Sequence, residues 1–147
     1  MHAGKVIRWI NFRERQYGGK IKPRWFDCLG NTRVSGAYPE KIYYFHSITR
    51  TRRVGIRHIS FNLSKYPFLT ESSYLYFNEG KYSYTEQDIA NKDISIKGEM
   101  DKLDLKIIYD GILHEPRKSY TDMELFDIHD SLNSIGLHGL KKPSPIR

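Results

Sequence analysis

The stretch GGKIKPRWFDCLG, residues 18–30, joins a pair of glycines, three cations and an apolar run, and it organises the first half of the chain. The two glycines predict a flexible turn. The apolar residues that follow predict a strand over 24–29. Lys20, Lys22 and Arg24 stand at the beginning of that strand, where a purely structural strand would not need them. We interpret the stretch as a strand that delivers positive charge to an anionic ligand.

Further short strands are expected on both sides of this stretch. They are predicted from β-branched and aromatic residues and their bounding turns, at 5–12, 41–48, 54–62, 73–77 and 82–84. Residues 78–80, Asn-Glu-Gly, are typical of a hairpin turn between the last two. Many short strands with brief loops indicate a small barrel or a tightly curved sheet.

The last third of the chain changes to helical periodicity. Apolar residues recur at helical spacing from Met100 to Ile112, which predicts one helix. Thr121, followed three residues later by Glu124, resembles a capping box. The apolar residues after it predict a second amphipathic helix that ends near Gly136.

These elements predict one α+β domain over residues 1–147, with the sheet first and the helices after it. Its mainly β part is expected at about 4–90 and its helical part at about 95–137, followed by a tail at 138–147. The length of 147 residues suits a single domain with a core of its own.

Composition favours a cytoplasmic protein that does not cross a membrane. Hydrophobic residues make up 39% of the chain and charged residues 28%, which is ordinary for a globular domain. No apolar run is long enough to span a bilayer, and the first residues lack the apolar segment of a secretory signal. The single cysteine, Cys28, fits a reducing compartment.

Positive charge is concentrated in the first part of the chain. Residues 1–58 contain 13 Lys and Arg against three acids, whereas residues 59–147 contain 11 against 14. The net charge of +7 is therefore the sum of a strongly basic part and a mildly acidic one. This asymmetry predicts a face that binds a polyanion, and nucleic acid is the commonest such ligand.

Motifs for metal, nucleotide or acyl-transfer chemistry are missing from the sequence. It has no CxxC, HExxH, GxxxxGK[ST] or GxSxG pattern, so we expect no metal site and no cofactor. RNA carries its own nucleophile, the 2′-OH, and a ribonuclease therefore needs only a proton acceptor, a proton donor and cations. A second basic group, Arg50, Arg52 and Arg53, follows strand 41–48 and could share one cleft with the cations of the opening stretch.

The order of these elements resembles the MazF/PemK family of toxin endoribonucleases. GKVIRWINF (4–12), KPRWFDCLG (22–30) and IYYFHSITR (42–50) are similar to the first three conserved strands of that family. FLTESSYLYFNEGKYSYTEQDI (68–89) resembles its later region, and the helix after Glu99 takes the place of its C-terminal helix. The resemblance covers roughly residues 4–113.

The resemblance implies an SH3-like curved antiparallel β-barrel with C-terminal helices, usually a homodimer. It also implies cleavage of single-stranded RNA without a metal, and inhibition by an antitoxin protein. The family's catalytic arginine falls on Lys22, and the threonine that contacts the scissile phosphate falls on Thr49. The loop that covers the RNA corresponds to residues 13–20.

Lysine and arginine are not interchangeable at a bidentate phosphate contact, so other residues are considered for the role of the arginine. Arg24 projects from the same strand face as Lys22, and His46 is a further acid–base candidate. The alternative for His46 is a buried, hydrogen-bonded histidine. The residues expected to bind RNA are Arg13, Arg15, Tyr17, Lys20, Arg50, Arg52 and Arg53.

Three functional hypotheses follow from the sequence. The first is a metal-independent endoribonuclease of the MazF/PemK type. The second is a non-catalytic nucleic-acid-binding barrel that has lost the catalytic arginine. The third is an interaction protein whose basic part docks an acidic partner peptide.

Overall fold

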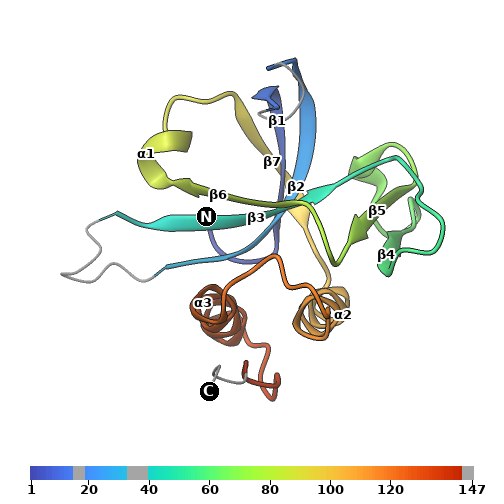
Figure 1. The fold of residues 1–147 in the computed structure, drawn as a ribbon. Coiled ribbons are helices and arrows are strands. Elements are labelled where there is room, and N and C mark those ends of the chain that lie inside the picture. Colours follow the sequence, from blue (N-terminus) through green and yellow to red (C-terminus); the bar gives the residue numbers. More distant parts are fainter. Residues whose placement is uncertain (15–18, 33–39, 144–147) are drawn as a thin grey trace.

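The fold is described from a computed structural model, which covers residues 1–14, 19–32 and 40–143 (Figure 1). Five antiparallel strands form the main sheet in the order β6-β3-β2-β1-β7. Their bounds are β1 Lys5–Arg13, β2 Ile21–Asn31, β3 Ile42–Ile48, β6 Lys81–Thr85 and β7 Ile94–Glu99. A second sheet pairs β4 (His58–Phe61) with β5 (Ser73–Tyr76), and a 3-10 turn, η1 (Pro67–Leu69), lies between these two strands in the chain.

The main sheet is buried on both faces, because two apolar cores lie on its two sides. Along β2, Phe26 and Cys28 belong to one core, which is rich in aromatic rings from β1, β3 and β6. Leu29 belongs to the other core, which the C-terminal helices cover. Two-sided burial explains why β3 is almost continuously apolar rather than alternating.

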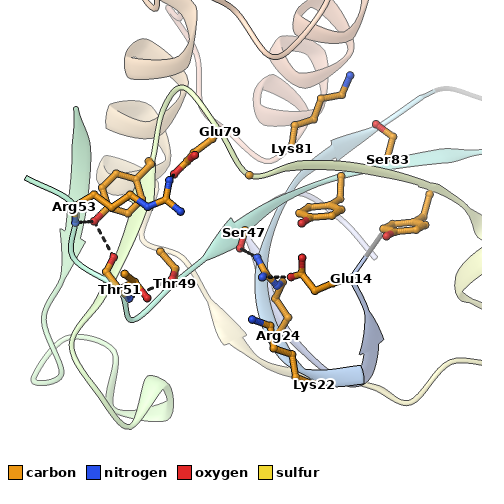
Figure 2. Close-up of a pocket in the computed structure, with 14 residues that line it drawn as sticks. Glu14, Lys22, Arg24, Ser47, Thr49, Thr51, Arg53, Glu79, Lys81 and Ser83 are labelled. Carbon is orange, nitrogen blue, oxygen red and sulfur yellow. Dashed lines mark hydrogen bonds and ion pairs between the residues drawn. The ribbon is translucent and has the colours of Figure 1, made fainter. Parts of the chain in front are cut away.

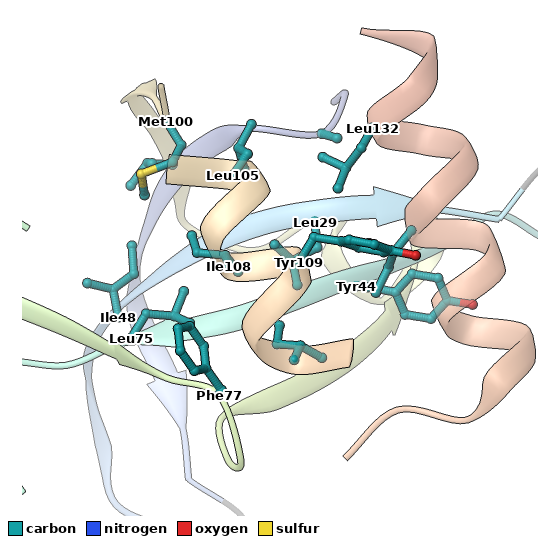
Figure 3. Packing of buried hydrophobic residues seen from close by; sticks show 14 of the residues in the cluster. Leu29, Tyr44, Ile48, Leu75, Phe77, Met100, Leu105, Ile108, Tyr109 and Leu132 are labelled. Carbon is teal, nitrogen blue, oxygen red and sulfur yellow. The ribbon is translucent and has the colours of Figure 1, made fainter. Parts of the chain in front are cut away.

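Helices α2 (Lys102–Leu113) and α3 (Asp122–Ser134) lie on one side of the main sheet, and the short helix α1 (Glu86–Ile89) lies on the other (Figure 1). Figure 3 shows Leu105 and Ile108 of α2 beside Leu29 of β2 in the larger core. The capping box expected at the start of α3 is present, since the side chain of Thr121 accepts from the backbone N–H of Glu124.

Helix α3 approaches β2 closely at one glycine. A Cβ at Gly30 would lie 2.5 Å from the Cβ of Ser131, so a larger residue would push the helix away. The Ser131 hydroxyl accepts from the Asn31 N–H at 3.1 Å and donates to the Asn31 carbonyl at 3.1 Å. This contact fixes α3 against the sheet and explains the glycine that closes the opening sequence stretch.

The predicted α+β class is confirmed, whereas two details of the prediction are corrected. The turn at 78–80 does not close a hairpin, because β5 and β6 pair with strands of different sheets. Residues 94–99 form a strand, β7, rather than the beginning of the helical part. Within the described residues β6 and β7 remain the two edges of an open sheet, and no closed barrel is formed. None of the helices in this part of the chain is long and apolar enough to cross a membrane.

Candidate active site

A cleft of about 640 Å³ opens beside the N-terminal half of β2, the end of β3 and the beginning of β6 (Figure 2). Lys22 and Arg24 line it from β2, and Ser47 lines it from β3. Residue 24 faces the same side as Phe26, so the cleft lies at the end of the aromatic core. Strand alternation therefore directs both β2 cations into one cavity.

Arg24 is held in place by contacts on three sides. Its guanidinium forms an ion pair with the carboxylate of Glu14 and donates to the Ser47 hydroxyl at 3.0 Å. It also lies over the rings of Phe12 and Tyr82, at 5.7 and 5.9 Å from their centroids. A guanidinium has more N–H donors than these two acceptors use, so it can still donate to a phosphate.

Glu14 is the functional candidate that sequence reasoning missed. It follows β1 directly, and its backbone N–H donates to the Lys20 carbonyl at 3.0 Å, which continues the β1–β2 pairing. The residue is only 4% exposed, and its carboxylate lines the cleft beside Arg24. A usable signal was present: Glu14 lies two residues after Phe12, so alternation along β1 places both on one face.

The opposite wall of the cleft carries hydroxyls and a second ion pair. Thr49 is fixed by backbone hydrogen bonds to Tyr74, at 2.9 and 2.7 Å, and its hydroxyl accepts from the Thr51 N–H at 3.2 Å. Arg53 forms an ion pair with Glu79. Hydroxyl donors therefore face the Arg24 side across the cavity (Figure 2).

The cleft carries more positive than negative charge. Four cations, two acids and three tyrosines line it: Lys22, Arg24, Arg53, Lys81, Glu14, Glu79, Tyr76, Tyr82 and Tyr84. Lys81 also bonds to Glu124 of α3, at 2.7 Å. Cations with hydroxyls and aromatic rings at one place match the groups of a single-stranded nucleic acid, namely phosphates, sugars and bases.

The structure brings together some of the predicted site residues and separates others. Lys22, Arg24, Thr49 and Arg53 all line the cleft. The predicted RNA-binding residues outside its lining are Arg13, Lys20, Arg50 and Arg52. Arg13 instead donates to the Gly19 carbonyl at 3.2 Å, and Arg50 donates to the Thr70 hydroxyl at 3.0 Å. Arg15 and Tyr17 lie outside the described residues.

His46 lies in the core and not in the cleft. The residue is fully buried, with Nε2 2.7 Å from the Tyr76 carbonyl and Nδ1 2.9 Å from the Tyr120 hydroxyl. The carbonyl can only accept, so Nε2 carries the hydrogen and Nδ1 accepts from the tyrosine. Burial lowers the pKa of His46 to about 4. The expectation that His46 takes part in catalysis is therefore corrected in favour of a buried structural histidine.

Among the residues that the structure describes, no group of three His, Cys, Asp or Glu side chains is placed to hold a metal ion. The chain matches no protein-family model and no curated protein.

Proposed function

We propose that this protein is a metal-independent endoribonuclease of the MazF/PemK toxin type, which cleaves single-stranded RNA through attack of the 2′-OH. One observation carries the proposal: a buried carboxylate, Glu14, is paired with Arg24 in a cleft that also exposes Lys22 and Thr49. A carboxylate beside cations supplies the proton acceptor and the charge stabilisation that this reaction needs.

In the proposed reaction Glu14 accepts the proton of the 2′-OH while O2′ attacks the adjacent phosphorus. The bond between phosphorus and O5′ breaks, which leaves a 2′,3′-cyclic phosphate on one fragment. Lys22 donates a proton to the departing O5′, so that the second fragment ends in a 5′-hydroxyl. Each side chain acts as a proton carrier, and the protein itself is not oxidised or reduced.

The remaining cleft residues hold the phosphate. Arg24 donates to the phosphate oxygens, whose negative charge increases in the pentacoordinate state. Ser47 and Glu14 hold the guanidinium in position before RNA arrives, which lowers the ordering cost at the moment of reaction. Thr49 contributes a hydroxyl donor from the opposite wall. The catalytic arginine of the MazF/PemK family falls on Lys22 in this sequence. In this scheme Arg24 supplies the guanidinium instead.

The sequence resemblance extends the proposal beyond the cleft. The curved antiparallel sheet with α2 and α3 on one side is consistent with an elaborated SH3-like architecture. We further propose a homodimer that acts in the cytoplasm and is inhibited by an antitoxin protein. The basic charge of residues 1–58 would attract an acidic inhibitor as well as RNA.

The test is incubation of the purified protein with unstructured RNA in EDTA. We expect fragments that end in a 2′,3′-cyclic phosphate, and no cleavage at a position where 2′-deoxyribose replaces ribose. If the RNA stays intact but binds to the protein with a steep salt dependence, the enzyme hypothesis is wrong. The protein is then a non-catalytic nucleic-acid-binding protein. If the protein binds an acidic peptide and does not bind RNA, the result supports the third hypothesis, an interaction protein.

A further inference from the structure

A second cavity, of about 730 Å³, lies between the C-terminal half of β1, the end of β6 and the segment around α1. We infer that this cavity binds one unstacked nucleobase of an RNA chain whose phosphate occupies the cleft. The inference rests on the proposed function and adds to it a site for base recognition.

The cavity exists because β7 stops pairing with β1 halfway along. Pairing begins at Lys5 and Glu99 and reaches Trp9 and Ile94, after which the Ile10 N–H donates to the Asp93 carbonyl at 3.0 Å. The chain before β7 then turns away into α1. The C-terminal half of β1 consequently has β2 on one side and the cavity on the other.

The floor of the cavity is aromatic. Trp9 forms edge contacts with Phe12 and Tyr84, at centroid distances of 5.1 and 5.0 Å, and all three rings line the cavity. The indole N–H of Trp9 is buried and forms no hydrogen bond with any described residue. Trp9 and Phe12 are almost fully buried, so the half-buried ring of Tyr84 is the surface on which an unpaired base can stack.

The rim of the cavity is polar and carries several carboxamides. Asn11, Gln87 and Asn91 each offer one acceptor and a pair of donors, which is the combination needed to read the edge of a base. The structure records no hydrogen bond for the side chains of Gln87 and Asn91 within the described ranges. Arg13 and Lys92 line the same cavity as Asp88 and Asp93, so the rim carries no net charge, which suits an uncharged base rather than a phosphate.

The cavity and the cleft share an aromatic wall. Tyr84 lines both, and the ring of Phe12, which lines the cavity, lies under the guanidinium of Arg24. An RNA chain that runs past Tyr84 therefore places a phosphate in the cleft and a neighbouring base in the cavity. This continuity favours single-stranded RNA as the occupant, because an unpaired base enters a side cavity without the cost of breaking a base pair.

Nucleosides test the cavity separately from the cleft, because they carry a base and no phosphate. The probe is the fluorescence of Trp9 in a Trp25→Phe variant, in which Trp9 is the only tryptophan. We expect at least one of the four ribonucleosides to quench this fluorescence in a saturable way, whereas ribose 5-phosphate does not. If Trp25→Phe does not fold, equilibrium dialysis of the same nucleosides against the wild-type protein replaces the measurement.

Two variants locate the site of binding. The double variant Gln87→Ala/Asn91→Ala is expected to weaken nucleoside binding roughly fivefold or more, as for loss of a base-reading contact. The matched control is Lys22→Ala, which changes the cleft and should leave nucleoside binding unaltered. Equal nucleoside affinity in the double variant and the parent protein would overturn the assignment.

The outcomes separate this inference from the proposed function. RNA cleavage in EDTA without saturable binding of any nucleoside would overturn the base site and leave the ribonuclease proposal standing. Saturable nucleoside binding that depends on Gln87 and Asn91, without RNA cleavage, would support the base site and overturn the ribonuclease proposal.

Discussion

The two faces of β2 and β3 carry two polar clusters, of which one lines an open cleft and the other lies under the helices. On one face Glu14 and Arg24 form an ion pair that lines the open cleft. On the other face Asp27 and His46 occupy paired positions beneath the helices, and His46 bonds to Tyr120. Both Asp27 and His46 are fully buried.

Glu14 is almost as buried as Asp27 and His46, at 4% exposed, so the two clusters differ in whether they border an open cleft rather than in residue type or burial. Histidine is the commonest acid–base residue in enzymes, yet His46 uses both ring nitrogens to join the sheet to the polypeptide that covers it. The Glu14 carboxylate lies where a bound phosphodiester can meet it. A difference of one residue along a strand decides between the two faces.

The largest effect is expected for Glu14→Gln, which keeps the shape of the side chain and removes its ability to accept a proton. We expect RNA cleavage to fall about 10²- to 10⁴-fold, the usual contribution of a general base. The measurement is kcat/KM on an unstructured RNA. Glu71→Gln is the matched control, because Glu71 pairs with Arg50 outside the cleft lining. Cleavage at the wild-type rate in Glu14→Gln would show that Glu14 is not the base.

His46→Ala is expected to affect stability rather than chemistry. The substitution leaves the Tyr120 hydroxyl and the Tyr76 carbonyl without their partner and opens a cavity, so the free energy of unfolding should fall by about 2–4 kcal/mol. Urea unfolding gives this value, and kcat/KM per folded molecule should stay unchanged.

The control for this variant is His114→Ala, because His114 is exposed at the end of α2 and bonds only to the Asp110 carbonyl. We expect it to lower the free energy of unfolding by less than His46→Ala. A strong loss of cleavage with unchanged stability in His46→Ala would return His46 to the catalytic machinery.

Much of the fold could be predicted from the sequence, because its signals are local. Strand composition and helical periodicity located most of the elements, and the capping residue Thr121 marked the start of α3. The pairing of β5 and β6 with separate sheets could not be predicted, because a turn sequence at 78–80 gives no information on which strands lie beside it.

The candidate site was predictable where it depended on one strand. Lys22 and Arg24 were found because they stand at the beginning of one strand, and Thr49 was found through the family resemblance. Glu14 was missed because its role depends on the pairing between β1 and β2, which brings it to Arg24. His46 was misplaced because β3 is apolar on both faces, so alternation did not show which face is covered.

Asp27→Asn tests the buried cluster through its pH dependence. Burial raises the pKa of the Asp27 carboxyl well above its usual value, so the folded protein keeps a proton that the unfolded chain releases. The stability contributed by this group is present below about pH 4 and is lost as the pH rises. The free energy of unfolding of Asp27→Asn, relative to that of the wild type, should increase by up to about 1.4 kcal/mol for each pH unit as the pH rises. Urea titrations between pH 4 and 8 measure it.

His46 provides the opposite slope and therefore an internal control. Its pKa is lowered to about 4, so the unfolded chain takes up the proton first, and stability is lost as the pH falls from about 6.5 toward 4. In the wild-type protein the slopes of Asp27 and His46 oppose each other over this range. In Asp27→Asn only the His46 slope remains, so the free energy of unfolding should fall visibly as the pH drops from about 6.5 toward 4. Identical pH profiles for the variant and the wild type would show that Asp27 does not keep its proton in the fold.

The smallest effect is expected for Lys22→Ala on RNA binding. Lys22 is exposed at the beginning of β2, so its contact with a phosphate is screened, and its removal should weaken binding only several-fold. The slope of log affinity against log salt should fall by about one, the value for one phosphate contact. Fluorescence anisotropy with 2′-deoxy-substituted RNA, which cannot be cleaved, measures both quantities. Lys106→Ala on the exposed side of α2 is the control and should keep the wild-type slope. If both variants keep that slope, Lys22 does not contact the phosphate, and Arg24 alone must anchor the RNA from β2.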